Sequence, residues 1–336
     1  MKVKKINLFI IIFALITNIM GGHLQNKLKK LNNIECFSYI ADEISKGSLN
    51  NQGYLNEFNS LRLVIDSKNS DKLPDNFRKS SDSIGILQNK DLNLKGLDTL
   101  NESGSAQFSE NGMYLLKKSI DDKFNIYIVD LREESHGFIN GIAVSWKDAE
   151  NKANKGLTKE QVIFDENEKL NSISIGNPIT IYNNNEHLII PEKVQNEKQL
   201  VESSNMSYIR IPVTDNERPT DDKVDYFVDF IKNLKPNSWL HFHCKRGLGR
   251  TTTFMVMYDI MKNSKNVSLE DIMKRQILLG GQNLIVEENN KFNYKNYSQE
   301  RWNFLKNFYN YSRENNDNFK TSWSSWIKSK EYEKTA

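Results

Sequence analysis

The fold of this chain is decided by the stretch His241-Phe242-His243-Cys244-Lys245-Arg246-Gly247-Leu248-Gly249-Arg250-Thr251-Thr252. An apolar pair, Trp239-Leu240, leads into this stretch, and a long apolar segment from Thr253 to Met261 follows it. Apolar runs on either side of a glycine-containing turn predict a strand, a tight loop and a helix. Such units build α/β folds, so we expect an α/β protein.

The loop contains the groups needed to hold a phosphate and attack it. Gly247 and Gly249 permit the backbone angles that curl consecutive N–H groups around an anion, and the helix that begins near Thr251 directs its positive end there. The planar fork of Arg250 can bind two phosphate oxygens. In this field Cys244 is expected to be a nucleophilic thiolate, with the Thr251 hydroxyl as its hydrogen-bond donor.

Two plainer interpretations of the loop have to be weighed. A single cysteine at the end of a strand is often only a small buried apolar residue, and a Gly-x-Gly pair alone indicates little. The joint pattern of His-Cys, five residues, Arg and Thr favours a catalytic loop. Other phosphate loops do not fit, because the chain has no Gly-x-x-x-x-Gly-Lys-Ser/Thr and lacks the third glycine of a dinucleotide-binding loop.

Composition limits the class of protein. The 336 residues are enough for one large domain or two modest ones, and 26% charged with 38% hydrophobic residues predict a folded core. The formal charge is +3, and three lysines lie in the first 22 residues, so the remainder is close to neutral. We therefore expect no nucleic-acid partner. No cluster of His and Cys suggests a metal, and we expect neither metal nor cofactor.

The N-terminus has the composition of a targeting segment. Lys2, Lys4 and Lys5 precede the apolar run Ile6 to Met20, which is shorter than the roughly 20 residues of a membrane-spanning helix. We predict a signal peptide over residues 1–22, export, no membrane partner after cleavage, and a loosely attached leader over residues 23–56. An uncleaved N-terminal anchor is the alternative. Cys36 is expected to be buried in this leader rather than bonded to Cys244.

Several further elements are expected along the chain. We predict strands at 58–65, 124–131, 207–211 and 239–243. Helices are predicted after N-caps at Ser109 and Thr220, at 196–203, at 268–279 with Ser268 as the N-cap, and at 297–311. Short strand-like pieces at 141–146, 172–175, 179–182 and 188–190 predict a β-rich insertion around 138–194. The charged cluster Arg132 to Gly137 ends a predicted strand, and is equally consistent with a ligand site and with a solvated strand end.

Asp215 lies on the loop that precedes the helix before the cysteine loop. In a parallel sheet with right-handed crossovers, both loops emerge at the same edge. Asp215 can then reach the cysteine loop and protonate a leaving oxygen. An aspartate in a loop is more often a simple turn residue, and the spacing alone leaves both interpretations open.

The pattern His243-Cys244-x5-Arg250-Thr251 is the signature of the protein-tyrosine-phosphatase (PTP) superfamily. Over residues 60–330 the chain also resembles the bacterial PTP-like phytases, which are inositol-polyphosphate phosphatases. The segments that carry this resemblance are Asp130-Leu131-Arg132-x-Glu134-Ser135-His136-Gly137, Val144-Ser145-Trp146, Thr214-Asp215-x-x-x-Pro219-Thr220, the cysteine loop and Trp323-Ser324-x-Trp326. The resemblance implies a PTP-like core over residues 57–330, with a central, mostly parallel sheet flanked by helices. It also implies a small partial β-barrel, which agrees with the β-rich stretch.

The resemblance also implies roles for individual residues. Cys244 corresponds to the nucleophile, Arg250 to the phosphate clamp and Asp215 to the general acid. Thr251, as the hydrogen-bond donor to the thiolate, is expected to help Cys244 leave again. Phosphate or substrate contacts are expected from Lys245, Arg246, Gly247, Leu248, Gly249, Arg78 and His243. Members of the family often have an acidic and a small residue where this chain has Lys245 and Arg246, so these two residues are expected to influence the choice of substrate.

The expected function is hydrolysis of phosphate monoesters, with inositol polyphosphates as substrates. The alternatives are a phosphotyrosine or dual-specificity protein phosphatase acting on phosphopeptides, and a phosphoinositide phosphatase. A phosphate-binding module without catalysis is a further alternative, although a binding module needs neither a thiol nor an acid.

Overall fold

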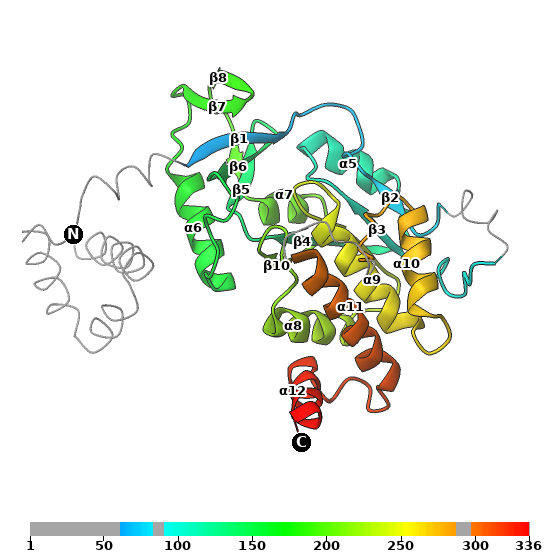
Figure 1. The fold of residues 1–336 in the computed structure, drawn as a ribbon. Coiled ribbons are helices and arrows are strands. Elements are labelled where there is room, and N and C mark those ends of the chain that lie inside the picture. The colour runs from blue at the N-terminus through cyan, green and yellow to red at the C-terminus, as the bar shows by residue number, and fades with distance from the viewer. Residues whose placement is uncertain (1–60, 83–90, 287–296, 336) are drawn as a thin grey trace, which may run out of the picture. The chain divides into compact units, whose positions relative to one another are not determined.

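The computed structural model describes residues 61–82, 91–286 and 297–335 (Figure 1). The predicted signal peptide, the leader and Cys36 lie outside the described residues. Among the residues that are described, no helix combines the length and the apolar character that crossing a bilayer requires.

The central sheet has five strands in the order β10-β4-β11-β3-β2. Four of them run parallel, and only the short β2 is antiparallel to its neighbour. The strands are β2 (Arg78–Lys79), β3 (Glu102–Ser105), β4 (Asn125–Arg132), β10 (Ser207–Val213) and β11 (Ser238–His243). Every residue of β11 is buried, as expected for the middle strand of a parallel sheet that is covered on both faces.

Alternate residues of the strands supply two hydrophobic clusters, one on each face of this sheet. On one face Val129 and Leu131 pack with helices α8 (Asp221–Lys232), α9 (Gly249–Asn263), α10 (Leu269–Leu278), α11 (Tyr297–Glu314) and α12 (Trp323–Thr335). On the other face Ile126 and Ile128 pack with α5 (Glu110–Lys118) and α7 (Glu197–Ser203). The predicted α/β fold, a mostly parallel sheet flanked by helices, is confirmed.

Helix α9 brings the cysteine loop into the middle of the protein. Phe254, Met255, Val256 and Met257 have no exposed surface, so the helix is buried along most of its length. It begins at Gly249, immediately after the loop that follows β11. Because both the strand and the helix are held by the core, the loop between them has little freedom to move.

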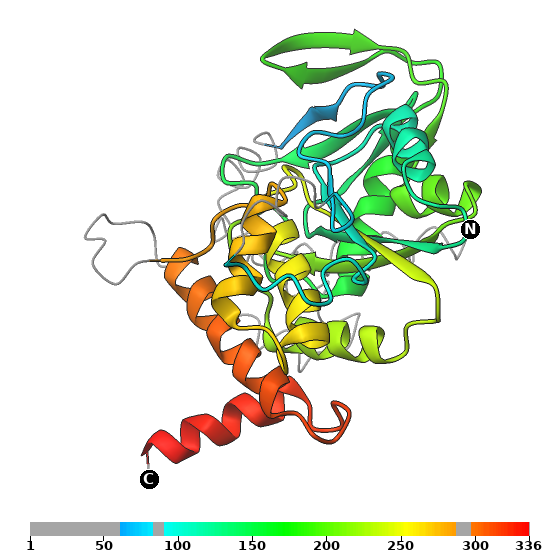
Figure 2. The same cartoon turned by 90° about the vertical axis from the view of Figure 1, so that its right-hand side faces the viewer.

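A second sheet of six strands has the order β8-β7-β1-β6-β5-β9. All neighbouring pairs are antiparallel except β1 with β7. The strands are β1 (Arg62–Ser67), β5 (His136–Ile139), β6 (Ile142–Lys147), β7 (Ile179–Asn183), β8 (Asn185–Ile189) and β9 (Val194–Gln195). Figure 2 shows the β7–β8 hairpin (green) projecting at the top, far from the C-terminal helix α12 (red). The β-rich character of this stretch is as expected, whereas its closure into a partial barrel stays a prediction.

Two features of the second sheet differ from the predictions. Its strand β1 lies outside the predicted insertion, much earlier in the sequence. The stretch from 138 to 194 also contains a helix, α6 (Lys159–Asn171). The buried side of α6 carries Val162, Glu166 and Leu170, so a glutamate interrupts the apolar period that would have indicated a helix. The strand predicted at 172–175 is wrong, because Ser172 is the C-cap of this helix.

The predicted N-caps have different outcomes. The hydroxyls of Ser109 and Ser268 accept hydrogen bonds from the backbone N–H groups of Gly112 and Asp271, as N-caps do. Thr220 occupies the N-cap position of α8, but its side chain makes no capping bond. Its hydroxyl donates to the carboxylate of Asp222 instead, because an acid in the first helical turn competes for it.

Candidate functional site

Gly247 allows the loop between β11 and α9 to turn. Its φ of +68° lies in the left-handed region, and a Cβ at this position would lie 2.2 Å from the backbone nitrogen of Ala106. Glycine is therefore required here for two reasons, conformation and space. Gly249 differs from the prediction, because its φ is not positive. A Cβ there would instead lie 3.0 Å from Nη1 of Arg301, so a larger residue would crowd the end of this arginine.

Cys244 is the first residue after β11, and its thiol is surrounded by groups that favour the thiolate. It is only 3% exposed, and the Thr251 hydroxyl donates a hydrogen bond to its Sγ over 3.2 Å. Burial by itself would raise the pKa of Cys244. The Arg250 guanidinium, the Thr251 hydroxyl and backbone N–H groups of the loop lower the pKa more strongly, so it lies below the usual thiol value.

The guanidinium of Arg250 is held in place before any ligand binds. Nη1 and Nη2 donate to the two carboxylate oxygens of Glu134 over 2.7 and 3.0 Å, and Nη1 also donates to the carbonyl of Val213. Burial alone would raise the pKa of Glu134, but Arg250 and Arg132 hold it well below its usual range. Glu134 belongs to the charged cluster at the end of β4, which is buried, so the solvated interpretation of that cluster is wrong.

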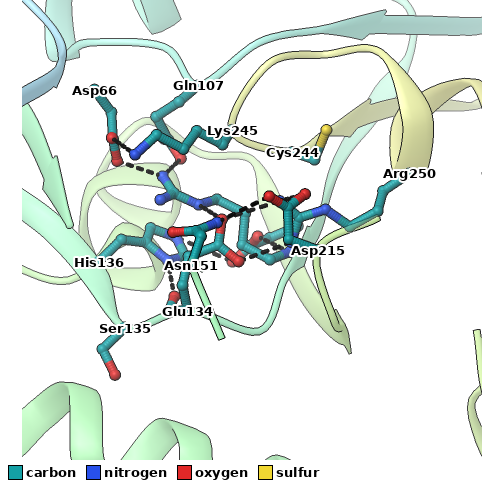
Figure 3. Close-up of polar contacts among 12 residues, drawn as sticks. Asp66, Gln107, Glu134, Ser135, His136, Asn151, Asp215, Cys244, Lys245 and Arg250 are labelled. Atoms are coloured by element: carbon teal, nitrogen blue, oxygen red, sulfur yellow. Dashed lines mark hydrogen bonds and ion pairs between the residues drawn. The ribbon is translucent and has the colours of Figure 1, made fainter. Parts of the chain in front are cut away.

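Asp215 reaches the cysteine loop, as the order of the strands implies. Its Oδ1 lies 3.1 Å from Nη2 of Arg250, and its side chain is 30% exposed. Oδ2 accepts a hydrogen bond from Nδ2 of Asn151 over 3.1 Å (Figure 3). Asn151 lies in the segment between β6 and α6, and no motif in the sequence pointed to it.

A pocket of about 490 Å³ lies over the loop, and Cys244, Arg250 and Asp215 all contribute to its walls. Arg301 of α11 lines it too, although it was not among the predicted site residues. Arg301 is 6% exposed, and Nη2 donates to the carbonyl of Glu217. Among the residues the structure describes, no carboxylate forms an ion pair with Arg301. Its buried positive charge faces a pocket that is suited to an anion.

The two cations that follow Cys244 have different surroundings. Nζ of Lys245 lies 2.7 Å from Oδ1 of Asp66, a buried carboxylate of β1, and Figure 3 shows the lysine turned toward it. Asp66 also pairs with Arg132 over 2.8 Å. Arg246 is exposed at the mouth of the pocket, beside Leu248. Both cations line the pocket, but Lys245 is paired with a carboxylate and, among the residues that the structure describes, Arg246 is not. Contact of either residue with a substrate stays a prediction.

Arg78 forms hydrogen bonds with the cysteine loop and with the first turn of α9. Its Nη1 donates to the carbonyl of Gly247 over 2.9 Å, and its Nη2 donates to the hydroxyl of Thr252 over 3.1 Å. Arg78 is 4% exposed, and burial lowers its pKa to about 10. It does not line the pocket, so the contact with a substrate phosphate that the resemblance implied stays a prediction.

His243 does not belong to the wall of the pocket, which corrects the expected substrate contact. The ring of His243 has no exposed surface, and His243 is absent from the lining of the pocket. Its Nε2 lies 2.6 Å from Oε1 of Glu197. Burial would raise the pKa of Glu197, but His243 outweighs this and lowers it to about 2.

The surroundings of His243 include a possible set of metal ligands. Donor atoms of Asp130, Glu197 and His243 lie within 4.8 Å of one another. The negative charge there is already balanced by side chains, because Nη1 of Arg210 lies 2.9 Å and Nε2 of His136 3.2 Å from Asp130. Burial would lower the pKa of His136, yet the carboxylates of Asp130 and Glu166 raise it to about 10, so the ring is a cation at neutral pH. These contacts describe a salt-bridge network rather than a metal centre.

Comparison with known proteins identifies relatives that match most of this chain. The sequence model of the PTP-like phytase family, whose description is inositol hexakisphosphate, matches residues 129–262. A PTP-like phytase from Bdellovibrio bacteriovorus is 34% identical, with 80% of this chain and 94% of that chain covered and a TM-score of 0.66. The tandemly repeated PTP-like phytase of Mitsuokella multacida is 33% identical over 89% of this chain, with a TM-score of 0.73.

Other relatives bear on ligand and setting. The Mitsuokella multacida PTP-like myo-inositol phosphatase is also known in complex with myo-inositol-(1,3,4,5)-tetrakisphosphate, and matches with a TM-score of 0.71. Effector protein hopD2 of Pseudomonas syringae pv. tomato is 28% identical over 211 residues, or 59% of this chain. The chain spans 58% of the Mitsuokella chain and 45% of hopD2. The match to the Bdellovibrio phytase, over nearly the full length of that protein, shows that this chain belongs to the PTP-like phytase family.

Proposed function

We propose that this chain is a phosphoric monoester hydrolase that removes phosphate groups from inositol polyphosphates through a phosphocysteine intermediate. The observation that carries the proposal is the convergence of Cys244, Arg250 and Asp215 on one pocket. A thiolate, a fixed guanidinium and an acid are the groups that nucleophilic displacement at phosphorus uses. The inositol tetrakisphosphate complex of the Mitsuokella relative supports the class of substrate.

In the first step, Sγ of Cys244 attacks the phosphorus of the ester. The sulfur–phosphorus bond forms while the bond to the ester oxygen breaks, and Asp215 donates its proton to that leaving oxygen. Arg250 and the N–H groups of the loop stabilise the three remaining phosphate oxygens. Asp215 lies 3.1 Å from Nη2 of Arg250, so a phosphate that binds this nitrogen displaces the carboxylate toward the leaving oxygen.

In the second step, water attacks the phosphocysteine. Asp215, now a carboxylate, accepts the proton of the water, the oxygen–phosphorus bond forms and the sulfur–phosphorus bond breaks. The Thr251 hydroxyl, 3.2 Å from Sγ, stabilises the thiolate that leaves. Inorganic phosphate departs and Asp215 is protonated again for the next cycle.

Replacing the sulfur tests the chemistry of the first step. We expect Cys244→Ser to lose turnover by at least about a thousandfold, because an unactivated hydroxyl is a poor nucleophile, and to retain binding of inositol hexakisphosphate. Phosphate release would be measured on inositol hexakisphosphate, a lower inositol phosphate and a phosphotyrosine peptide, and binding by calorimetry. Turnover by the variant at the wild-type rate would contradict the mechanism. A wild type that prefers the phosphotyrosine peptide would favour a protein phosphatase.

The leaving group tests the role of Asp215. Asp215→Asn should lower kcat on an inositol phosphate by about a hundredfold or more, since the alkoxide then leaves without a proton. The loss on p-nitrophenyl phosphate should be much smaller, because the nitrophenolate leaves readily as an anion. Asp122→Asn, at an exposed position away from the pocket, serves as the matched control. Equal losses on both substrates would assign Asp215 a structural role only.

The ionisation of Cys244 gives a prediction that does not require the substrate. The charged groups around the thiol lower its pKa, so the rate of alkylation by iodoacetamide should reach half its maximum below pH 9.0, the ordinary thiol value. Thr251→Ala removes one donor to the thiolate, which disfavours the charged form and should move this midpoint to higher pH. Thr251→Ser keeps the donor and should restore the midpoint. A midpoint that is the same in all three proteins would exclude the Thr251 hydroxyl as a stabilising group.

We also propose that the chain is exported after cleavage of residues 1–22. The basic start and the short apolar run of these residues support export. The Pseudomonas relative is named an effector protein, which also supports it. Mass determination of the protein recovered from the medium should give a chain without about the first 22 residues. Recovery of the full-length chain from the membrane fraction would favour an uncleaved anchor.

A further inference from the structure

We propose that Arg246 is a specificity-determining residue, and that it joins the catalytic pocket to a second anion-binding pocket. The second pocket would take a phosphate group that neighbours the reacting one on a polyphosphorylated inositol ring. This inference rests on the function proposed above, since it assigns a further subsite for the same substrates. It concerns the two loop positions at which the chain departs from the usual pattern of its family.

The first observation is that Asp66 holds Lys245 in an ion pair, although Lys245 still lines the pocket. The side chain of Asp66 has no exposed surface, and its carboxylate pairs with Lys245 over 2.7 Å and with Arg132 over 2.8 Å. Burial would raise the pKa of Asp66, but the two cations lower it, so it stays charged. Separating Lys245 from this carboxylate would remove one of the two cations that balance its buried charge, which is unfavourable.

The second observation is that Arg246 remains available. Its side chain is exposed, and within the described ranges the structure records no ion pair for it. Its backbone is held firmly, because Nδ2 of Asn76 donates to its carbonyl over 2.8 Å. Arg78 holds the carbonyl of the next residue, Gly247, over 2.9 Å. The backbone of Arg246 is therefore held in place, and its guanidinium is available to bind an anion.

The third observation is a second pocket of about 440 Å³ on the other side of Arg246. Lys245 and Arg246 line both pockets, so the two share a wall. Two further lysines, Lys68 and Lys72, line the second pocket, and both are exposed. No ion pair of either lysine is recorded among the described parts of the chain. The acids of the lining are Asp75 and Asp66, and the latter is already neutralised.

These features suit a ring that carries several phosphates. When one phosphate lies at Cys244, the neighbouring groups of the ring must lie against the walls of the pocket, where Arg246 is the shared cation. Arginine binds phosphate oxygens through a planar fork, and flexible lysines add point charges. A substrate with a single phosphate on a small leaving group has nothing to place there. The second pocket should therefore affect polyphosphorylated substrates selectively.

The test compares two substrates in the same proteins. Arg246→Ala and the double variant Lys68→Ala/Lys72→Ala should each lower kcat/KM for inositol 1,3,4,5-tetrakisphosphate by about tenfold or more, mainly through KM. The double variant should change kcat/KM for p-nitrophenyl phosphate by no more than about twofold, because that ester does not reach the second pocket, and Arg246→Ala should lower it less than it lowers the value for the tetrakisphosphate. Arg313→Ala, which removes an exposed arginine of α11, controls for the change in net charge.

The outcomes separate this inference from the proposed function. Equal losses on both substrates, or no loss on the tetrakisphosphate, would overturn the second subsite. A wild-type protein that hydrolyses neither ester would instead overturn the proposed function. Phosphatidylcholine vesicles that carry phosphatidylinositol 3,4,5-trisphosphate present the same phosphorylated ring on a lipid. A selective loss seen only with the soluble ester assigns the pocket to free inositol phosphates, and one seen only with vesicles assigns it to lipid headgroups.

Discussion

The buried ion pair between Arg250 and Glu134 is the interaction on which the site depends. Two hydrogen bonds of 2.7 and 3.0 Å join side chains that are each about 1% exposed. Loss of either partner would leave a buried charge without one of its main counterions, and the two bonds hold the guanidinium in one orientation. Because Glu134 also accepts from Arg132 over 2.9 Å, its own position is fixed. The phosphate clamp is therefore organised before a ligand arrives, which is how a fixed charge is most effective.

This pair begins a series of alternating charges that connects the two sheets. Arg132, at the end of β4, contacts Glu134 and also Asp66 of β1, and Asp66 in turn binds Lys245. The second sheet thus supplies the acid that neutralises one cation of the catalytic loop. The segment after β6 supplies Asn151, which holds the carboxylate of Asp215. The second sheet is consequently part of the machinery that sets the charge of the pocket.

Much of the fold and the centre of the site were predictable from sequence, and the exceptions have physical causes. Strand β11, the loop and helix α9 follow from apolar runs on either side of a glycine whose φ is positive. Helix α6 was missed because Glu166 occupies its buried side, where Arg210 and the backbone N–H of His136 bind its carboxylate. A buried glutamate with remote partners removes the hydrophobic period on which the prediction of a helix relies.

The sequence by itself determined the strand–loop–helix unit and the type of chemistry, because backbone angles, apolar period and residue spacing are local properties. Only the tertiary structure decided which charges are free to act. Lys245 and Arg246 are neighbours with the same charge, yet Asp66, far away in the chain, pairs with the lysine and leaves the arginine exposed. Likewise Arg301 faces the pocket only because α11 packs against α9. The field at a site is a sum over charges that folding brings together, and local sequence does not contain that sum.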